Sequence, residues 1–233
     1  MLICLDAGHG GKDSGACGAY SKEKDIALNT VLKLGAVLKK LGFDVMYTRT
    51  TDVFVSLSNR ASIANKANAD IFVSVHCNSA ASSSANGTET LCYNNCKLAE
   101  EIQSALVYET GLRNRGIKIR QDLVVLNSTK MTAVLVEIAF ISNRAEEQLI
   151  NDETWIERNV TAIAKGICSS YGIPYIKEEM EMVTETEMNI GGQAKTVRRI
   201  LRDGENYVRL RDLESIINID YDAATKVVSV ASK

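Results

Sequence analysis

Hydrophobic residues in the first 175 positions form two kinds of pattern, which follow each other along the chain. Short runs without helical spacing predict strands at 2–6, 43–48, 70–76, 88–93 and 133–140, with a further short strand or extended segment at 123–126. Longer segments with apolar residues on one stripe predict helices at 23–41, 56–67, 97–110 and 153–171, and a short helix after Asn143. Strands that alternate with helices, several of them apolar throughout, predict an α/β fold with a mainly parallel sheet and helices on both faces.

The pattern changes after Pro174, which is the only proline in the chain. Residues 176–187 are mainly acidic and polar, so they are expected to form a linker. Short strands at 196–201, 206–210, 219–221 and 227–230, with a helical piece at 212–217, then predict a small β-β-α-β-β module. We therefore expect an α/β domain large enough to hold a catalytic site at 1–175, a linker at 176–187 and a small α+β domain at 188–233.

Composition narrows the classes of partner. The formal net charge of −2, from 27 basic and 29 acidic residues, gives no reason to expect nucleic acid or an anionic membrane surface. No apolar run approaches the roughly 20 residues of a spanning helix. The first residues do not resemble a signal peptide, so we expect a protein made in the cytoplasm and released later, or a trimmed secreted protein. The six cysteines match no zinc-knuckle spacing and are expected to be reduced and mostly buried.

Glu137 is the one charged residue in the apolar run at 133–140. An unpaired buried carboxylate costs several kcal/mol, so such a group usually meets a cation, faces a cleft or becomes neutral. A salt bridge to a lysine or arginine is therefore a plain structural alternative to a catalytic role.

The chain has only two histidines, His9 and His76, and both lie at predicted strand ends. Proteins with parallel sheets bind their ligands at the carboxyl ends of the strands. These two histidines and Glu137 are therefore expected at one edge of the sheet. Two histidines placed in this way favour a metal over ordinary buried polar groups. Catalytic zinc usually takes three protein ligands, so the third must be a carboxylate. Spacing does not choose between Glu23 and Asp25, although Glu23 lies nearer the edge.

Two further carboxylates complete the predicted site. Glu137 is the candidate general base, because both histidines are already used as ligands and a carboxylate can carry a proton from water to a leaving nitrogen. Asp6 is a candidate outer partner that holds an imidazole in place, with an ordinary strand-end charge as the equal alternative.

Four segments of the chain, taken in order, resemble those of the zinc-dependent N-acetylmuramoyl-L-alanine amidases of the Amidase_3 type. They are LDAGHGG at 5–11, EKD at 23–25, VSVHCN at 73–78 and LVEIAFISN at 135–143, so the resemblance covers roughly residues 1–173.

This resemblance implies a zinc ion held by His9, Glu23 and His76, with Glu137 as the catalytic carboxylate. It also implies cleavage of the amide between N-acetylmuramic acid and the L-alanine of the peptidoglycan stem. Nothing in the residue spacing reports the bond that is cut. A zinc peptidase or deacetylase of wall material therefore stays open as an alternative, as does a wall-binding protein without activity.

A weaker resemblance covers the C-terminal module. Segments 204–213 and 221–226 are similar to the stalk-like module named after copper amine oxidase N-terminal domains, although this module contains no histidine that would bind copper. It is expected to bind wall polymer or to mediate self-association. An amidase with a linker and a small appendage is also similar to phage endolysins.

Overall fold

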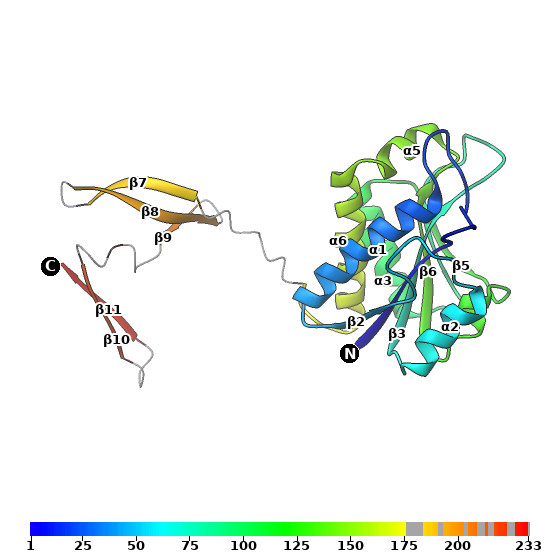
Figure 1. Cartoon of the computed structure of the whole chain (residues 1–233), viewed down its shortest axis with the longest axis horizontal. Coiled ribbons are helices and arrows are strands. Elements are labelled where there is room, and N and C mark those ends of the chain that lie inside the picture. Colours follow the sequence, from blue (N-terminus) through cyan, green and yellow to red (C-terminus); the bar gives the residue numbers. More distant parts are fainter. Residues whose placement is uncertain are drawn as a thin grey trace. The chain divides into compact units, whose positions relative to one another are not determined.

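The computed structural model describes residues 1–175, 184–190, 193–202, 205–208, 213, 217–222 and 227–232. They belong to two compact units, Met1–Ile176 and Lys177–Lys233 (Figure 1).

The first unit is built on one six-stranded sheet in the order β2-β1-β3-β6-β4-β5. Its strands are β1 (Leu2–Ala7), β2 (Asp44–Tyr47), β3 (Ile71–Asn78), β4 (Thr88–Cys92), β5 (Asn114–Ile119) and β6 (Thr132–Phe140). Neighbouring strands are parallel except β4 and β6, which run antiparallel. The sheet is therefore mainly parallel, as the apolar runs predict.

Helices cover both faces of this sheet (Figure 1). They are α1 (Glu23–Lys40), α2 (Leu57–Lys66), α3 (Lys97–Thr110), α4 (Val124–Asn127), α5 (Arg144–Ile150) and α6 (Glu153–Ser170). The larger core includes Ile26 of α1, Ile102 of α3 and Ile163 of α6. A smaller core includes Ala64 of α2 and Leu126 of α4. Burial of two separate apolar faces of the sheet confirms the predicted α/β fold class.

Helix ends lie where the sequence places its capping residues. The side chains of Ser56, Asn143 and Asp152 accept hydrogen bonds from the first backbone amides of α2, α5 and α6. Gly111 ends α3 with φ of 70°, a left-handed conformation that glycine adopts without a steric cost. These residues satisfy backbone groups that a helix leaves unpaired at its ends.

Two local predictions for the first unit are wrong. Residues 123–126 do not form a strand, because Val124–Asn127 makes the single helical turn α4. Their β-branched composition favours a strand, but the turn buries Val125 and Leu126 in the smaller core. Strand β5 was not predicted, because its sequence NRGIKI is polar and its position at the edge of the sheet leaves it mostly half-buried or exposed.

The described residues of the second unit form two antiparallel sheets. One has the order β7-β8-β9, from β7 (Thr184–Ile190), β8 (Gln193–Arg202) and β9 (Glu205–Val208). The other pairs β10 (Ile217–Asp222) with β11 (Val227–Ser232). Strand β7 begins inside the predicted linker, because pairing with β8 orders a polar segment whose composition gave no strand signal. Most of the predicted helical piece at 212–217 lies outside the described residues, and Ile217 already belongs to β10.

Candidate metal centre

The sheet topology brings the predicted site residues to one edge. Strands β1, β3 and β6 are parallel neighbours, so their carboxyl ends lie together. His9 follows the end of β1 by two residues, and His76 lies near the end of β3. Glu137 of β6 is the register partner of His76. Three segments distant in sequence thus place two imidazoles and a carboxylate side by side.

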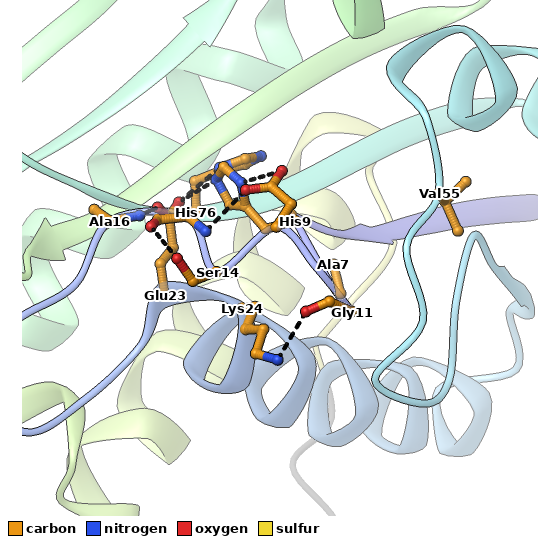
Figure 2. Close-up of polar contacts among 12 residues, drawn as sticks. Ala7, His9, Gly11, Ser14, Ala16, Glu23, Lys24, Val55 and His76 are labelled. Atoms are coloured by element: carbon orange, nitrogen blue, oxygen red, sulfur yellow. Dashed lines mark hydrogen bonds and ion pairs between the residues drawn. The ribbon is translucent and has the colours of Figure 1, made fainter.

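Glu23 joins the two histidines from a separate element, as the first residue of α1. Its Oε1 lies 3.1 Å from His9 Nε2 and 2.8 Å from His76 Nδ1 (Figure 2). Backbone amides hold the same carboxylate, since Ala16 N–H donates to Oε2 at 2.8 Å and Cys77 N–H donates to Oε1 at 3.1 Å. Asp25, the alternative ligand, is exposed.

The donor set suits a divalent cation. One ligand atom from each of His9, Glu23 and His76 lies within 4.8 Å of the other two. The two imidazole rings meet edge to face, with centroids 4.9 Å apart. Among the described residues no lysine or arginine pairs with Glu23. Two imidazoles and one carboxylate, left without a side-chain cation, are a typical protein ligand set for zinc.

The three candidate ligands change one another's pKa values. Burial disfavours charge on Glu23, but hydrogen bonds from His76 and His9 hold the pKa of its carboxyl well below the usual range. Burial likewise opposes charge on His9, yet Glu23 and Asp13 raise the pKa of its imidazole to about 9. The pKa of His76 is also raised, because its bond to Glu23 outweighs its burial. Without a metal the carboxylate therefore attracts protons to both imidazoles, and a cation would take their place.

Glu137 lies beside this cluster in an unusual state for a carboxylate. Its Oε2 is buried and has no hydrogen-bond partner in the described part of the chain. Burial raises the pKa of Glu137 to about 7, helped by the charges of Glu23 and Glu89 and opposed by His76 and His9. No lysine or arginine among the described residues forms a salt bridge with it, so the plain structural alternative is not met. A carboxylate with a pKa near neutrality can both accept and release a proton.

The glycine-rich loop after β1 allows the imidazoles to approach each other. A Cβ atom on Gly8 would lie 2.4 Å from the His76 ring, so only glycine leaves room there. His9 itself has a φ of 59°, which is uncommon for a residue with a side chain. The loop thus combines close packing at Gly8 with a strained backbone at His9.

Asp13 is a functional candidate that the sequence reasoning missed. Its Oδ2 lies 2.9 Å from Nδ1 of His9, and its Oδ1 accepts a hydrogen bond from Gly15 N–H at 3.0 Å. Such a partner fixes the orientation of a ligating imidazole and leaves Nε2 facing Glu23. Its position four residues after His9 in a polar loop was the only signal available in the sequence.

The predicted role of Asp6 as an imidazole partner is not what the structure shows. Its fully buried carboxylate is taken by three other side chains, from Thr48, Ser74 and Arg60. Because Asp6 is in β1, its side chain points into the interior below the loop and leaves the imidazole to Asp13. Asp6 therefore acts on the site only through the groups that it binds.

Cys77 follows His76 directly but offers no nucleophile. It is 3% exposed and packs in the larger core, on the opposite side of β3 from the histidine. Burial, together with the charges of Glu23 and Glu137, raises the pKa of its thiol well above the ordinary value. The thiol is neutral at physiological pH. All six cysteines are free, and four of them are buried.

Comparison with known proteins identifies the first unit. Residues 3–169 match the family model described as N-acetylmuramoyl-L-alanine amidase. The chain belongs to this amidase family. The match ends at residue 169, so the resemblance of the second unit to a stalk-like module stays a prediction. In the described part of the chain no helix is both long and apolar enough to cross a bilayer.

Relatives of this amidase include bacterial and phage proteins. It is 40% identical over 177 residues to the endolysin of Bacillus phage SPP1, covering 71% of this chain and 64% of that protein. It is 37% identical over 175 residues to the N-acetylmuramoyl-L-alanine amidase LytC of Bacillus subtilis, covering 72% of this chain and 35% of LytC. The catalytic domain of CwlV from Bacillus (Paenibacillus) polymyxa superposes with a TM-score of 0.71 and 36% identity, covering 74% of this chain and 99% of that structure.

Proposed function

We propose that this amidase hydrolyses the bond between N-acetylmuramic acid and the L-alanine of the peptidoglycan stem, with a zinc ion held by His9, Glu23 and His76. The observation that carries the proposal is the convergence of these three ligands beside Glu137, a buried carboxylate with an unpartnered oxygen. Membership of the amidase family supplies the class of substrate.

The ion would be bound by two neutral imidazoles and one carboxylate, and it would polarise the scissile carbonyl and lower the pKa of a water. Glu23 is held by two backbone amides and His9 by Asp13, so both ligands are oriented before the ion binds. Preorganised ligands of this kind reduce the entropy that must be lost on binding.

Glu137 carries the proton in this reaction. It accepts a proton from the attacking water and delivers it to the nitrogen of L-alanine as the amide bond breaks. Burial raises the pKa of Glu137 to about 7 in the metal-free protein. Burial thus makes this carboxylate a stronger base than an exposed glutamate, and the proton that it takes from water can pass on to the leaving nitrogen. Glu89, its register partner on β4, stays out of this exchange because Arg115 and Asn78 bind its two oxygens at 2.8 and 2.7 Å.

Product analysis tests the bond specificity. Purified protein loaded with zinc is incubated with isolated peptidoglycan, and newly formed amino groups are labelled and identified. New amino groups on L-alanine are expected. Amino groups within the stem would indicate a peptidase, and those on the sugar would indicate a deacetylase. Protein that sediments with cell walls and leaves them intact would instead be a wall-binding protein without this activity.

The appendage and the route to the wall belong to the same proposal. We infer that the second unit binds wall polymer or self-associates, and that the enzyme reaches the wall by endolysin-like release or as a secreted protein. The similarity to a phage endolysin supports the first route. Sedimentation of residues 177–233 fused to a fluorescent protein with purified walls would test the wall-binding role.

A further inference from the structure

Two buried arginines, Arg49 and Arg60, surround the backbone of the loop that carries His9. Their exposed fractions are 3% and 2%, which is rare for arginine. Arg49 follows β2, and Arg60 lies in the first half of α2. Of the two, only Arg60 has a carboxylate partner among the described residues, at 2.7 Å from Asp6. Burial lowers the pKa of Arg49, with the charge of Arg60 adding to the effect.

Half of their eight hydrogen bonds within the described residues go to the main-chain carbonyls of residues 7–9, where the chain leaves β1 and enters the loop with His9. Arg49 Nε donates to Ala7 O at 2.9 Å and Nη2 to Gly8 O at 2.7 Å. Arg60 Nη1 also donates to Ala7 O, and its Nη2 donates to His9 O at 2.5 Å. Three consecutive carbonyl groups therefore face guanidinium donors. This arrangement fixes the peptide planes on both sides of His9 and supports its uncommon φ of 59°.

Arg49 also reaches the element that carries the second ligand. The same Nη2 that binds Gly8 O donates to Lys24 O at 2.8 Å. Gly8 precedes one predicted ligand, His9, and Lys24 follows another, Glu23. The side chain of Lys24 also contacts the loop, because its Nζ donates a hydrogen bond to Gly11 O at 3.1 Å (Figure 2). One guanidinium nitrogen thus ties the β1 loop to the start of α1.

We propose that Arg49 and Arg60 are positioning residues that set the affinity of the metal centre. Both hold the backbone around His9, and Arg49 also ties it to the start of α1 beside Glu23. This inference rests on the proposed zinc site. The planar guanidinium group provides several hydrogen-bond donors in fixed directions, whereas the lysine ammonium group is a single compact charge. Lysine at either position keeps the charge but cannot reach all of these carbonyls. Loss of outer partners of a metal ligand typically weakens binding by about 10–100-fold.

The experiment compares zinc affinities of the full-length wild type, R49K, R60K and the matched control N65A. Asn65 lies on α2 with Arg60, but its side chain binds the backbone of Ser128 and Lys130, away from the metal-binding loop. Affinity is measured at 10 °C by competition with a chromophoric chelator, and circular dichroism checks that each metal-free protein is folded. Thermal unfolding of the metal-free proteins is recorded separately. A lysine variant that is unfolded at 10 °C is replaced by R49Q or R60Q.

Each lysine variant is expected to bind zinc about 10–100-fold more weakly than the wild type. Activity should recover when zinc is raised in proportion, because the ligands and Glu137 are intact. The control N65A should lose thermal stability and keep wild-type zinc affinity. Wild-type affinity in both arginine variants, whatever their melting temperatures, would reduce these residues to a purely structural role and overturn the inference. A wild type that binds no zinc would overturn the metal centre itself, and that result is read before any variant is made.

Discussion

Replacement of Glu137 by glutamine should stabilise the metal-free protein at pH 8. The same replacement should abolish most of the activity of the zinc-loaded enzyme. Glutamine has nearly the same shape as glutamate but cannot ionise. The wild-type carboxylate has a buried oxygen without a partner in the described part of the chain and a pKa raised to about 7. Glu137 therefore destabilises the fold when its carboxyl group is ionised. Catalytic groups with shifted pKa values often reduce stability in this way.

The magnitude follows from the pKa. A rise from 4.5 to about 7 corresponds to a loss of about 3 kcal/mol of folding free energy when the group is fully ionised. The glutamine amide is also buried without a partner, which costs about 1–3 kcal/mol. A net gain of up to about 2 kcal/mol is therefore expected for E137Q at pH 8. In a unit of this size a gain of about 2 kcal/mol raises the melting temperature by roughly 4–8 °C.

The sign of the pH dependence provides an internal control. Because the folded pKa is raised, the folded state binds the proton more tightly than the unfolded state between pH 4.5 and about 7. The free energy of unfolding of the wild type therefore falls as the pH rises through this window. Glutamine does not titrate, so E137Q lacks this loss of stability. Calorimetry in the presence of a chelator should show E137Q about 1–3 kcal/mol less stable than the wild type at pH 4.5 and up to about 2 kcal/mol more stable at pH 8.

Zinc-loaded E137Q should retain the metal and lose about 10²–10⁴-fold in turnover of peptidoglycan. Near-wild-type turnover would show that another group carries the proton. A variant less stable than the wild type at pH 8 would show that the carboxylate is stabilised in the fold, contrary to the reasoning from its unpartnered oxygen.

Three further substitutions follow from the packing and charges. G8A should fold but lose zinc affinity and activity, because the added methyl group would displace the His76 ring, and wild-type zinc affinity in a chelator competition would contradict this. E147Q should be about 1–2 kcal/mol less stable in urea unfolding at pH 7, since the carboxylate accepts bonds from the backbone of residues 20 and 21. These bonds lower the pKa of Glu147 against the effect of burial, so the difference should shrink below pH 4, and a gap independent of pH would exclude a role for the charge. G166A should cost about 1–3 kcal/mol in thermal unfolding, because its Cβ would lie 2.5 Å from the α3 backbone, and an unchanged melting temperature would show that the two helices separate easily.

The sequence by itself determined the fold class and most elements of the first unit, and it predicted His9, His76 and Glu137 at one edge of the sheet. These features depend on local rules. Apolar runs form buried strands, capping residues mark helix ends, and two histidines in 233 residues leave few alternatives for a metal site. The order of the four motifs then identified the family that the comparisons confirm. Where local preference and burial disagreed, at 123–126, the pattern predicted a strand and the core required a helical turn.

Only the tertiary structure decided which polar groups meet. Glu23 rather than Asp25 faces the histidines, because the first turn of α1 directs one carboxylate inward and leaves the other exposed. Asp13 rather than Asp6 binds His9, and Arg49 and Arg60 hold the loop by its carbonyls. Partners such as Arg60 and Asp6 are 54 residues apart, and backbone carbonyls occur at every residue. Their pairing depends on the three-dimensional path of the chain, on which local sequence patterns carry no information.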